Sequence, residues 1–162
     1  MTDTRAAIPT LTIAILSSHC LVWLGLQSIL ESSTSVPMVV LPHQKKLHDL
    51  LRPESRPDLF ILDVDTERHA VGTLTQIRES APTSRIVLLC GFEDKDRTRE
   101  ALANGVDGII LKVQPTEVVL AVIESLCASA KPQACVERHR ADGLSLGSPF
   151  KKKADSATPP LA

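Results

Sequence analysis

Short apolar segments alternate along the chain with longer segments that have helical periodicity. The apolar segments are Leu11–Leu16, Val36–Val40, Leu59–Val64, Arg85–Cys90 and Gly108–Lys112. Apolar residues at consecutive positions are typical of strands buried on both faces, as in a parallel sheet covered by helices. Pro37 indicates that the second segment is an edge strand or the start of a strand, because proline has no N–H to donate.

The segments between these strands, and the segment after the last one, have the spacing of helices. They are Leu21–Glu31, His43–Leu51, His69–Ser80, Asp94–Asn104 and Thr116–Ala128. The first of them places Val22, Leu26 and Ile29 on one face. Pro115 marks the start of the last helix, and Gly105 marks the end of the fourth. The alternation predicts an α/β fold, with an open, doubly wound parallel sheet and helices on both faces.

The periodic pattern divides the chain into three parts. Residues 1–9 are expected to form a flexible N-terminus and residues 10–130 a single domain, which suits a chain of 162 residues. Residues 131–162 have no periodicity and are rich in proline, glycine, serine, alanine and charged residues. We therefore expect a disordered tail in this last part.

Charge and composition argue against nucleic-acid binding. Residues 1–130 hold 12 basic and 16 acidic side chains, whereas residues 131–162 hold 6 basic and 3 acidic ones. The expected domain is therefore acidic and repels phosphate backbones, and an aromatic content of 2% leaves few platforms for stacking on bases. The tail is too short for a helix-turn-helix domain, and Lys151–Lys153 is more typical of a solubilising tail. Direct DNA binding is not expected.

The cysteines and the first residues favour a cytoplasmic protein. Cys20, Cys90, Cys127 and Cys135 lack metal-finger spacing, so we expect free thiols in a reducing compartment and no metal site. The apolar stretch Leu11–Leu16 is too short for a signal-peptide core or a membrane span. No membrane partner is expected.

Side chains that can carry chemistry gather where the predicted strands end. In an open parallel sheet, the functional crevice lies beyond the carboxyl ends of the strands. Asp63 ends one buried strand and Lys112 ends another, so we expect both at this crevice. A carboxylate can attack a phosphoryl group while an ammonium stabilises the phosphate oxygens, so the pair is a candidate phosphoryl-accepting site. A structural ion pair at the mouth of the sheet is the alternative interpretation.

Five stretches of the chain resemble the receiver domain of bacterial two-component response regulators. They are IAILSSHCLVWLGLQSIL, RPDLFILDVD, SRIVLLCGFED, ALANGVDGIILK and PTEVVLAVIESL, in the expected order within residues 10–130. The resemblance is to CheY-like receivers, especially the NarL/LuxR type, and implies a flavodoxin-like (βα)5 fold with strand order 2-1-3-4-5. It also implies phosphorylation by a histidine kinase, with Asp63 as the phospho-acceptor and Lys112 as the phosphate-binding lysine.

The chain departs from the family pattern around that aspartate. Ser17 and Ser18 stand where the family has an acidic pair that helps to hold Mg²⁺, and a neutral hydroxyl is a poor ligand for this cation. Cys90 stands at the phosphate-binding threonine or serine, and a thiol is a weaker hydrogen-bond donor than a hydroxyl. Ile109 and Ile110 stand in the region of the aromatic switch residue. Mg²⁺ binding is therefore expected to be weak or lost, and no cofactor is expected.

Two helices that the fold makes neighbours carry apolar residues outside their core faces. The segment Thr116–Ala128 is apolar nearly all round, and such a helix usually packs against a second partner. We therefore predict a partner or homodimer surface, formed by Trp23, Leu24, Val118 and Ala121. Scattered exposed apolar residues without a partner are the alternative.

These features predict a stand-alone, atypical receiver, or pseudo-receiver, in two-component phosphorelay signal transduction. It would act through contacts with a sensor histidine kinase or another regulator, and Asp63 would be phosphorylated weakly or not at all. Two alternatives stay open: a conventional response regulator that uses Asp63 and Lys112, and a LuxR-type transcriptional regulator that lacks its DNA-binding domain. An enzyme is not expected, because SSHCLV stands where a glycine-rich phosphate loop would follow the first strand.

Overall fold

A computed structural model of the chain describes residues 9–91 and 95–129. Apart from Pro9, the expected flexible N-terminus lies outside the described residues, as does the whole of the expected tail 131–162. Both expectations therefore stay predictions. Within the described ranges, every helix is too short or too polar to span a lipid bilayer.

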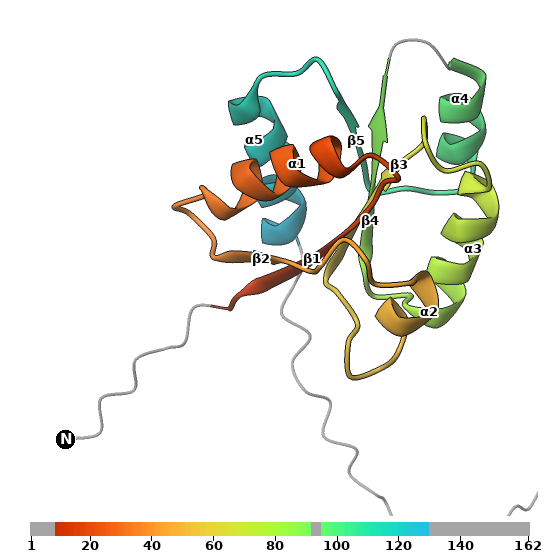
Figure 1. The fold of residues 1–162 in the computed structure, drawn as a ribbon, viewed down its shortest axis with the longest axis horizontal. Coiled ribbons are helices and arrows are strands. Elements are labelled where there is room, and N and C mark those ends of the chain that lie inside the picture. The colour runs from red at the N-terminus through yellow and green to blue at the C-terminus, as the bar shows by residue number, and fades with distance from the viewer. Residues whose placement is uncertain (1–8, 92–94, 130–162) are drawn as a thin grey trace, which may run out of the picture. The chain divides into compact units, whose positions relative to one another are not determined.

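Five parallel strands form one sheet in the order β2-β1-β3-β4-β5 (Figure 1). The strands are β1 (Leu11–Leu16), β2 (Met38–Val40), β3 (Leu59–Asp63), β4 (Arg85–Cys90) and β5 (Gly108–Leu111). The central strand β3 is buried at every position, because helices cover both faces of the sheet beside it. The doubly wound, flavodoxin-like α/β fold predicted from the sequence is confirmed, including the strand order.

Helices lie on both faces of this sheet, as Figure 1 shows. One face carries α1 (Cys20–Glu31) and α5 (Thr116–Ala128), and the other carries α2 (Leu47–Leu50), α3 (Ala70–Ser80) and α4 (Lys95–Ala103). Each face has its own apolar core. Leu26 and Ile123 are buried in the first core, and Leu74 and Ala101 in the second. Removal of these apolar side chains from water is the main driving force for the fold.

Two elements are shorter than the sequence indicated. The strand β2 begins at Met38 rather than Val36, because Pro37 has no N–H with which to pair. The helix α2 spans only Leu47–Leu50, so the prediction of a helix from His43 was wrong at its start. The preceding segment forms a turn instead, in which the N–H of Lys45 donates to the carbonyl of residue 42 at 3.2 Å.

The register of the sheet brings three strand ends to the same edge. Asp63 pairs with Leu89 in β4, and Cys90 pairs with Leu111 in β5. Between α4 and β5, Gly105 adopts a φ of 75°, the left-handed conformation expected of a glycine that ends a helix. The chain then enters β5 and leaves it directly before Lys112.

Candidate functional site

The side chain of Asp63 lies at the centre of the carboxyl edge of the sheet and is fully buried. Both of its carboxylate oxygens accept hydrogen bonds. Oδ1 lies 2.8 Å from Nζ of Lys112 and accepts the backbone N–H of Asp65 at 3.2 Å. Oδ2 accepts the hydroxyl of Ser17 at 2.7 Å. These partners supply the compensation that a buried carboxylate needs.

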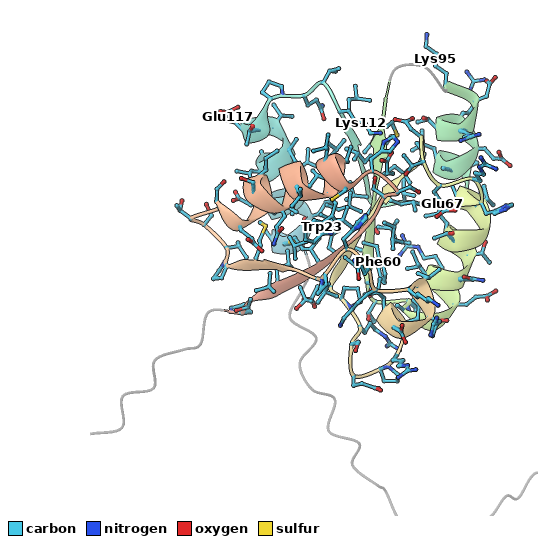
Figure 2. All side chains as sticks on the ribbon, in the orientation of Figure 1. Trp23, Phe60, Glu67, Lys95, Lys112 and Glu117 are labelled. Carbon is cyan, nitrogen blue, oxygen red and sulfur yellow. The ribbon has the colours of Figure 1, made fainter. Side chains whose placement is uncertain are left out.

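Lys112 contacts a second carboxylate as well. Its Nζ lies 2.7 Å from Oδ2 of Asp65, and its side chain is 24% exposed at the mouth of the sheet, where Figure 2 labels it. Burial alone would lower the pKa of Lys112, but the hydrogen bonds and charges of Asp63 and Asp65 outweigh that effect and raise it. The ammonium therefore stays charged and holds the two carboxylates together.

Asp65 joins this pair to the segment that follows β4. Its Oδ2 accepts the backbone N–H of Gly91 at 2.8 Å. A Cβ atom at position 91 would lie 2.8 Å from the same oxygen, so glycine is what lets the carboxylate approach the backbone so closely. Three segments, after β3, β4 and β5, thus meet at one carboxylate oxygen.

The turn after β1 is fastened to the same edge by hydroxyl and imidazole groups. The Ser17 hydroxyl that donates to Asp63 also accepts the N–H of His19 at 3.1 Å. The carbonyl of Ser17 lies 2.8 Å from Nε2 of His43, and the N–H of Ser18 donates to Oγ1 of Thr66 at 3.1 Å. The two predicted serines thus lie beside the aspartate, and the Ser17 hydroxyl orients it.

Cys90 is buried directly behind this site. Its backbone carbonyl accepts the N–H of Lys112 at 2.9 Å. Burial raises the pKa of the Cys90 thiol, and the charges of Asp65 and Asp63 add to the rise against an opposing hydrogen bond from Thr98. The thiol therefore stays protonated near neutral pH.

The donor set at this edge does not suit Mg²⁺. A hard dication prefers carboxylate oxygens, yet Ser17 contributes a hydroxyl that already donates its proton to Asp63. The ammonium of Lys112 is paired with both nearby carboxylates. In the part of the chain that the structure describes, no group of three or more histidine, cysteine, aspartate or glutamate side chains is arranged to hold a metal ion.

Known structures share this fold. A response regulator from Thermotoga maritima matches with a TM-score of 0.63 and 21% identity, over 75% of this chain and 100% of the other. A LuxR family DNA-binding response regulator from Staphylococcus aureus matches with a TM-score of 0.59 and 17% identity, over 72% of this chain and 98% of the other. At these identities the similarity concerns the fold alone.

No family model matches the chain, but several curated proteins are similar to it in sequence. The oxygen regulatory protein NreC of Staphylococcus epidermidis is 30% identical over 122 residues, which cover 70% of this chain and 53% of the relative. NreC of Staphylococcus haemolyticus is 25% identical over 157 residues, which cover 86% of this chain and 70% of the relative. The described part of the chain is a response-regulator receiver domain. It is related to LuxR/NarL-family regulators, and the chain spans about half the length of S. epidermidis NreC.

The four residues of the predicted partner surface lie on two neighbouring helices, and three of them are exposed. Leu24 is 48% exposed on α1, while Val118, 38% exposed, and Ala121 lie on α5. Trp23 instead packs against the core with its ring centroid 5.7 Å from that of His43, and its indole N–H is buried. Trp23 is therefore partly buried, and the partner surface of Trp23, Leu24, Val118 and Ala121 stays a prediction.

The positions of Asp65 and Gly91, just after buried strands, indicated that both lie at this edge, but no specific role was predicted for either residue. Gly91 directly follows Cys90 at the end of β4, and one residue separates Asp65 from Asp63 at the end of β3. That position was the available signal, because the ends of parallel strands meet at one edge. The hydrogen bond between them, however, joins the Asp65 side chain to the backbone N–H of Gly91. Such a bond cannot be predicted from the residue types alone.

Proposed function

We propose that this chain is an atypical receiver module of two-component signal transduction that works through protein contacts, with little or no phosphorylation of Asp63. A sensor histidine kinase or another regulator in the cytoplasm is the kind of partner that such a module contacts. The observation that carries the proposal is the hydrogen bond from Ser17 to Oδ2 of Asp63. A neutral hydroxyl stands there, where a phosphoryl-accepting site needs metal-binding carboxylates.

The charge at the site supports weak phosphoryl transfer. In the reaction, an oxygen of Asp63 would bond to phosphorus while the bond from phosphorus to its donor breaks. Positive charge must neutralise the phosphoryl oxygens in the transition state, and a metal ion supplies most of it in such reactions. The cation that the described structure places against Asp63 is the single ammonium of Lys112, and Asp65 already shares it.

One observation favours a second candidate, a conventional phospho-accepting regulator. Lys112 lies 2.8 Å from Asp63, so the carboxylate and the ammonium are close enough to act on one phosphoryl group. The proposal above and this alternative differ in the rate and extent of phosphorylation, and a direct measurement separates them.

The test is phosphorylation of the full chain by phosphoramidate, with and without Mg²⁺, followed by intact mass spectrometry over time. Asp63→Asn is the control, because it removes the acceptor oxygen while keeping the shape of the side chain. We expect little phosphoprotein and little effect of Mg²⁺. Rapid, stoichiometric and Mg²⁺-dependent phosphorylation that Asp63→Asn abolishes would favour the conventional regulator instead.

A further inference from the structure

We propose that the Asp65 carboxylate is a resident anion that occupies the place a phosphoryl group on Asp63 would need. The proposal rests on the proposed function, since it gives a reason for weak phosphorylation that is independent of the metal. It assigns to Asp65 the control of anion binding at this site.

The hydrogen-bond donors that a phosphoryl group on Asp63 would need are already bound to Asp65. Besides the hydroxyl of Ser17 and the N–H of Asp65, the described residues place two more donors at this edge: the ammonium of Lys112 and the N–H of Gly91. Both point at one atom, because Oδ2 of Asp65 lies 2.7 Å from the first and 2.8 Å from the second. An oxyanion arriving at Asp63 would therefore find these two donors already taken by a carboxylate.

The negative charge of Asp65 also opposes a phosphoryl group at this site. A phosphoryl group brings about two negative charges, and it would enter a site where Asp63 and Asp65 already share one ammonium. Like charges held this close in a partly buried site disfavour one another. Asp65, whose side chain is 28% exposed, thus opposes an incoming anion both by occupying donors and by repulsion.

Asp65 also makes the connection between strand ends that a phosphoryl group would make. The Asp65 carboxylate joins the segments after β3, β4 and β5 through Lys112 and Gly91, with no added ligand. A bound phosphoryl group would join the same three segments. In this protein the Asp65 side chain makes that connection, so the three segments are already joined while Asp63 is unmodified.

The test uses beryllofluoride, an anion that binds aspartate in the way a phosphoryl group does, on the full chain with Mg²⁺ present. Asp65→Ala removes the anion and Asp65→Asn removes its charge while keeping its shape. Glu67→Gln is the matched control, because Glu67 carries the same charge two residues later and its Oε1 accepts the N–H of His69. Figure 2 labels Glu67 on the loop between the sheet and α3.

We expect beryllofluoride to bind Asp65→Ala about tenfold or more tightly than wild type, with a smaller gain for Asp65→Asn and none for Glu67→Gln. Binding is followed by ¹⁹F NMR and thermal shift, and circular dichroism verifies that each variant is folded. The gain must vanish in Asp63→Asn/Asp65→Ala, since the anion binds Asp63.

Gly91→Ala provides a second, independent test that leaves Asp65 in the sequence. Its new Cβ would lie 2.8 Å from Oδ2 of Asp65, so the carboxylate must move away while Lys112 stays. The Gly91 backbone has a negative φ, so alanine fits its conformation. We expect tighter beryllofluoride binding here too, in the same direction as Asp65→Ala.

The two proposals fail in different ways. Ready phosphorylation of the wild type overturns the proposed function, whatever the variants do. Equal beryllofluoride affinity in wild type, Asp65→Ala and Gly91→Ala overturns the role of Asp65, whatever the wild-type level is. An equal gain in Glu67→Gln also overturns it, because general charge at the mouth would then explain the effect.

Discussion

At the residue scale, the position of one ammonium between two carboxylates makes Lys112 the residue on which the site depends. Its Nζ lies within 2.8 Å of Asp63 and 2.7 Å of Asp65, and the first of these carboxylates is fully buried. Removing the cation leaves a buried charge with fewer donors, which is costly. We therefore treat the lysine first as a stabilising group and only then as a phosphate ligand.

Lys112→Met should lower the free energy of unfolding near neutral pH by about 1.5–3 kcal/mol, the range for hydrogen bonds to charged groups. Because the pKa of Lys112 is raised in the folded protein, this contribution is complete below the unfolded value of about 10.4 and is lost as the pH rises through the folded value. Denaturant unfolding of both proteins across alkaline pH measures it. Lys95→Met, which removes an exposed lysine at the outer end of α4, is the control (Figure 2).

The role of the ammonium would be contradicted if the difference in free energy of unfolding between wild type and Lys112→Met stayed constant, or grew, as the pH rises through the folded pKa of Lys112. An equal loss of stability in the control Lys95→Met would also contradict it.

The serine pair can be tested by restoring carboxylates. Ser17→Asp/Ser18→Asp should lower stability without metal, because a new carboxylate would stand beside buried Asp63 in place of the donating hydroxyl. Added Mg²⁺ should then stabilise the double variant by about 2.7 kcal/mol once it is about 100-fold above its Kd. Thermal shift against Mg²⁺ concentration is the measurement.

Wild type should show little response to Mg²⁺ in the same experiment. Ser28→Asp adds a carboxylate on an exposed position of α1 and serves as the charge control. If wild type responded to Mg²⁺ as strongly as the double variant, the hydroxyls would not be what limits metal binding.

At the element scale, Asp107 fastens the start of β5 to β4 and α3. Its carboxylate accepts the N–H of Ile86 at 2.8 Å and contacts Arg78 at 2.9 Å and Arg85 at 3.1 Å. Burial alone would raise the pKa of Asp107, but the Ile86 N–H and the two guanidinium groups outweigh it and lower that pKa. The charged form therefore stabilises the folded state.

Asp107→Asn should cost about 1.5–3 kcal/mol of stability at neutral pH, since hydrogen bonds to a charged group are lost. With a folded pKa below the unfolded value of about 3.9, the wild-type advantage is present above that value and disappears as the pH falls through the folded pKa. Urea unfolding at several acidic pH values measures this. Asp96→Asn, at a side chain 96% exposed on α4, should change little.

The elements also show where the sequence pattern was sufficient. The helix α5 begins and ends where Pro115 and its apolar run predicted, because helical periodicity and a start signal agree there. The short α2 was overestimated, because His43 contacts Ser17 across the sheet edge and such a tertiary contact has no local signal. Likewise the meeting of Asp63 and Lys112 followed from parallel strands, whereas the bond from Gly91 to Asp65 depends on one side-chain rotamer.

At the scale of the whole molecule, exposed apolar residues on α1 and α5 bear on association. Leu24 is 48% exposed and Val118 is 38% exposed, although the two helices pack beside each other on the same face of the sheet. A mostly apolar hollow of about 480 Å³ lies beside Val118, between α5 and the start of β5, and includes Ala121 and Leu126. Apolar surface of this kind is typical of places where a second protein binds.

Self-association through this face predicts that the full chain has a concentration-dependent mass in light scattering, rising towards that of a dimer. Leu24→Glu/Val118→Glu should keep it monomeric, because charges buried in an apolar contact lose their hydration without gaining a partner. Leu102→Glu is the matched control, since Leu102 is 41% exposed on α4, across the sheet from α1 and α5. A wild-type chain that stays monomeric at millimolar concentration would show that the face serves no second copy. Dissociation by Leu102→Glu would instead place the contact on the α4 face.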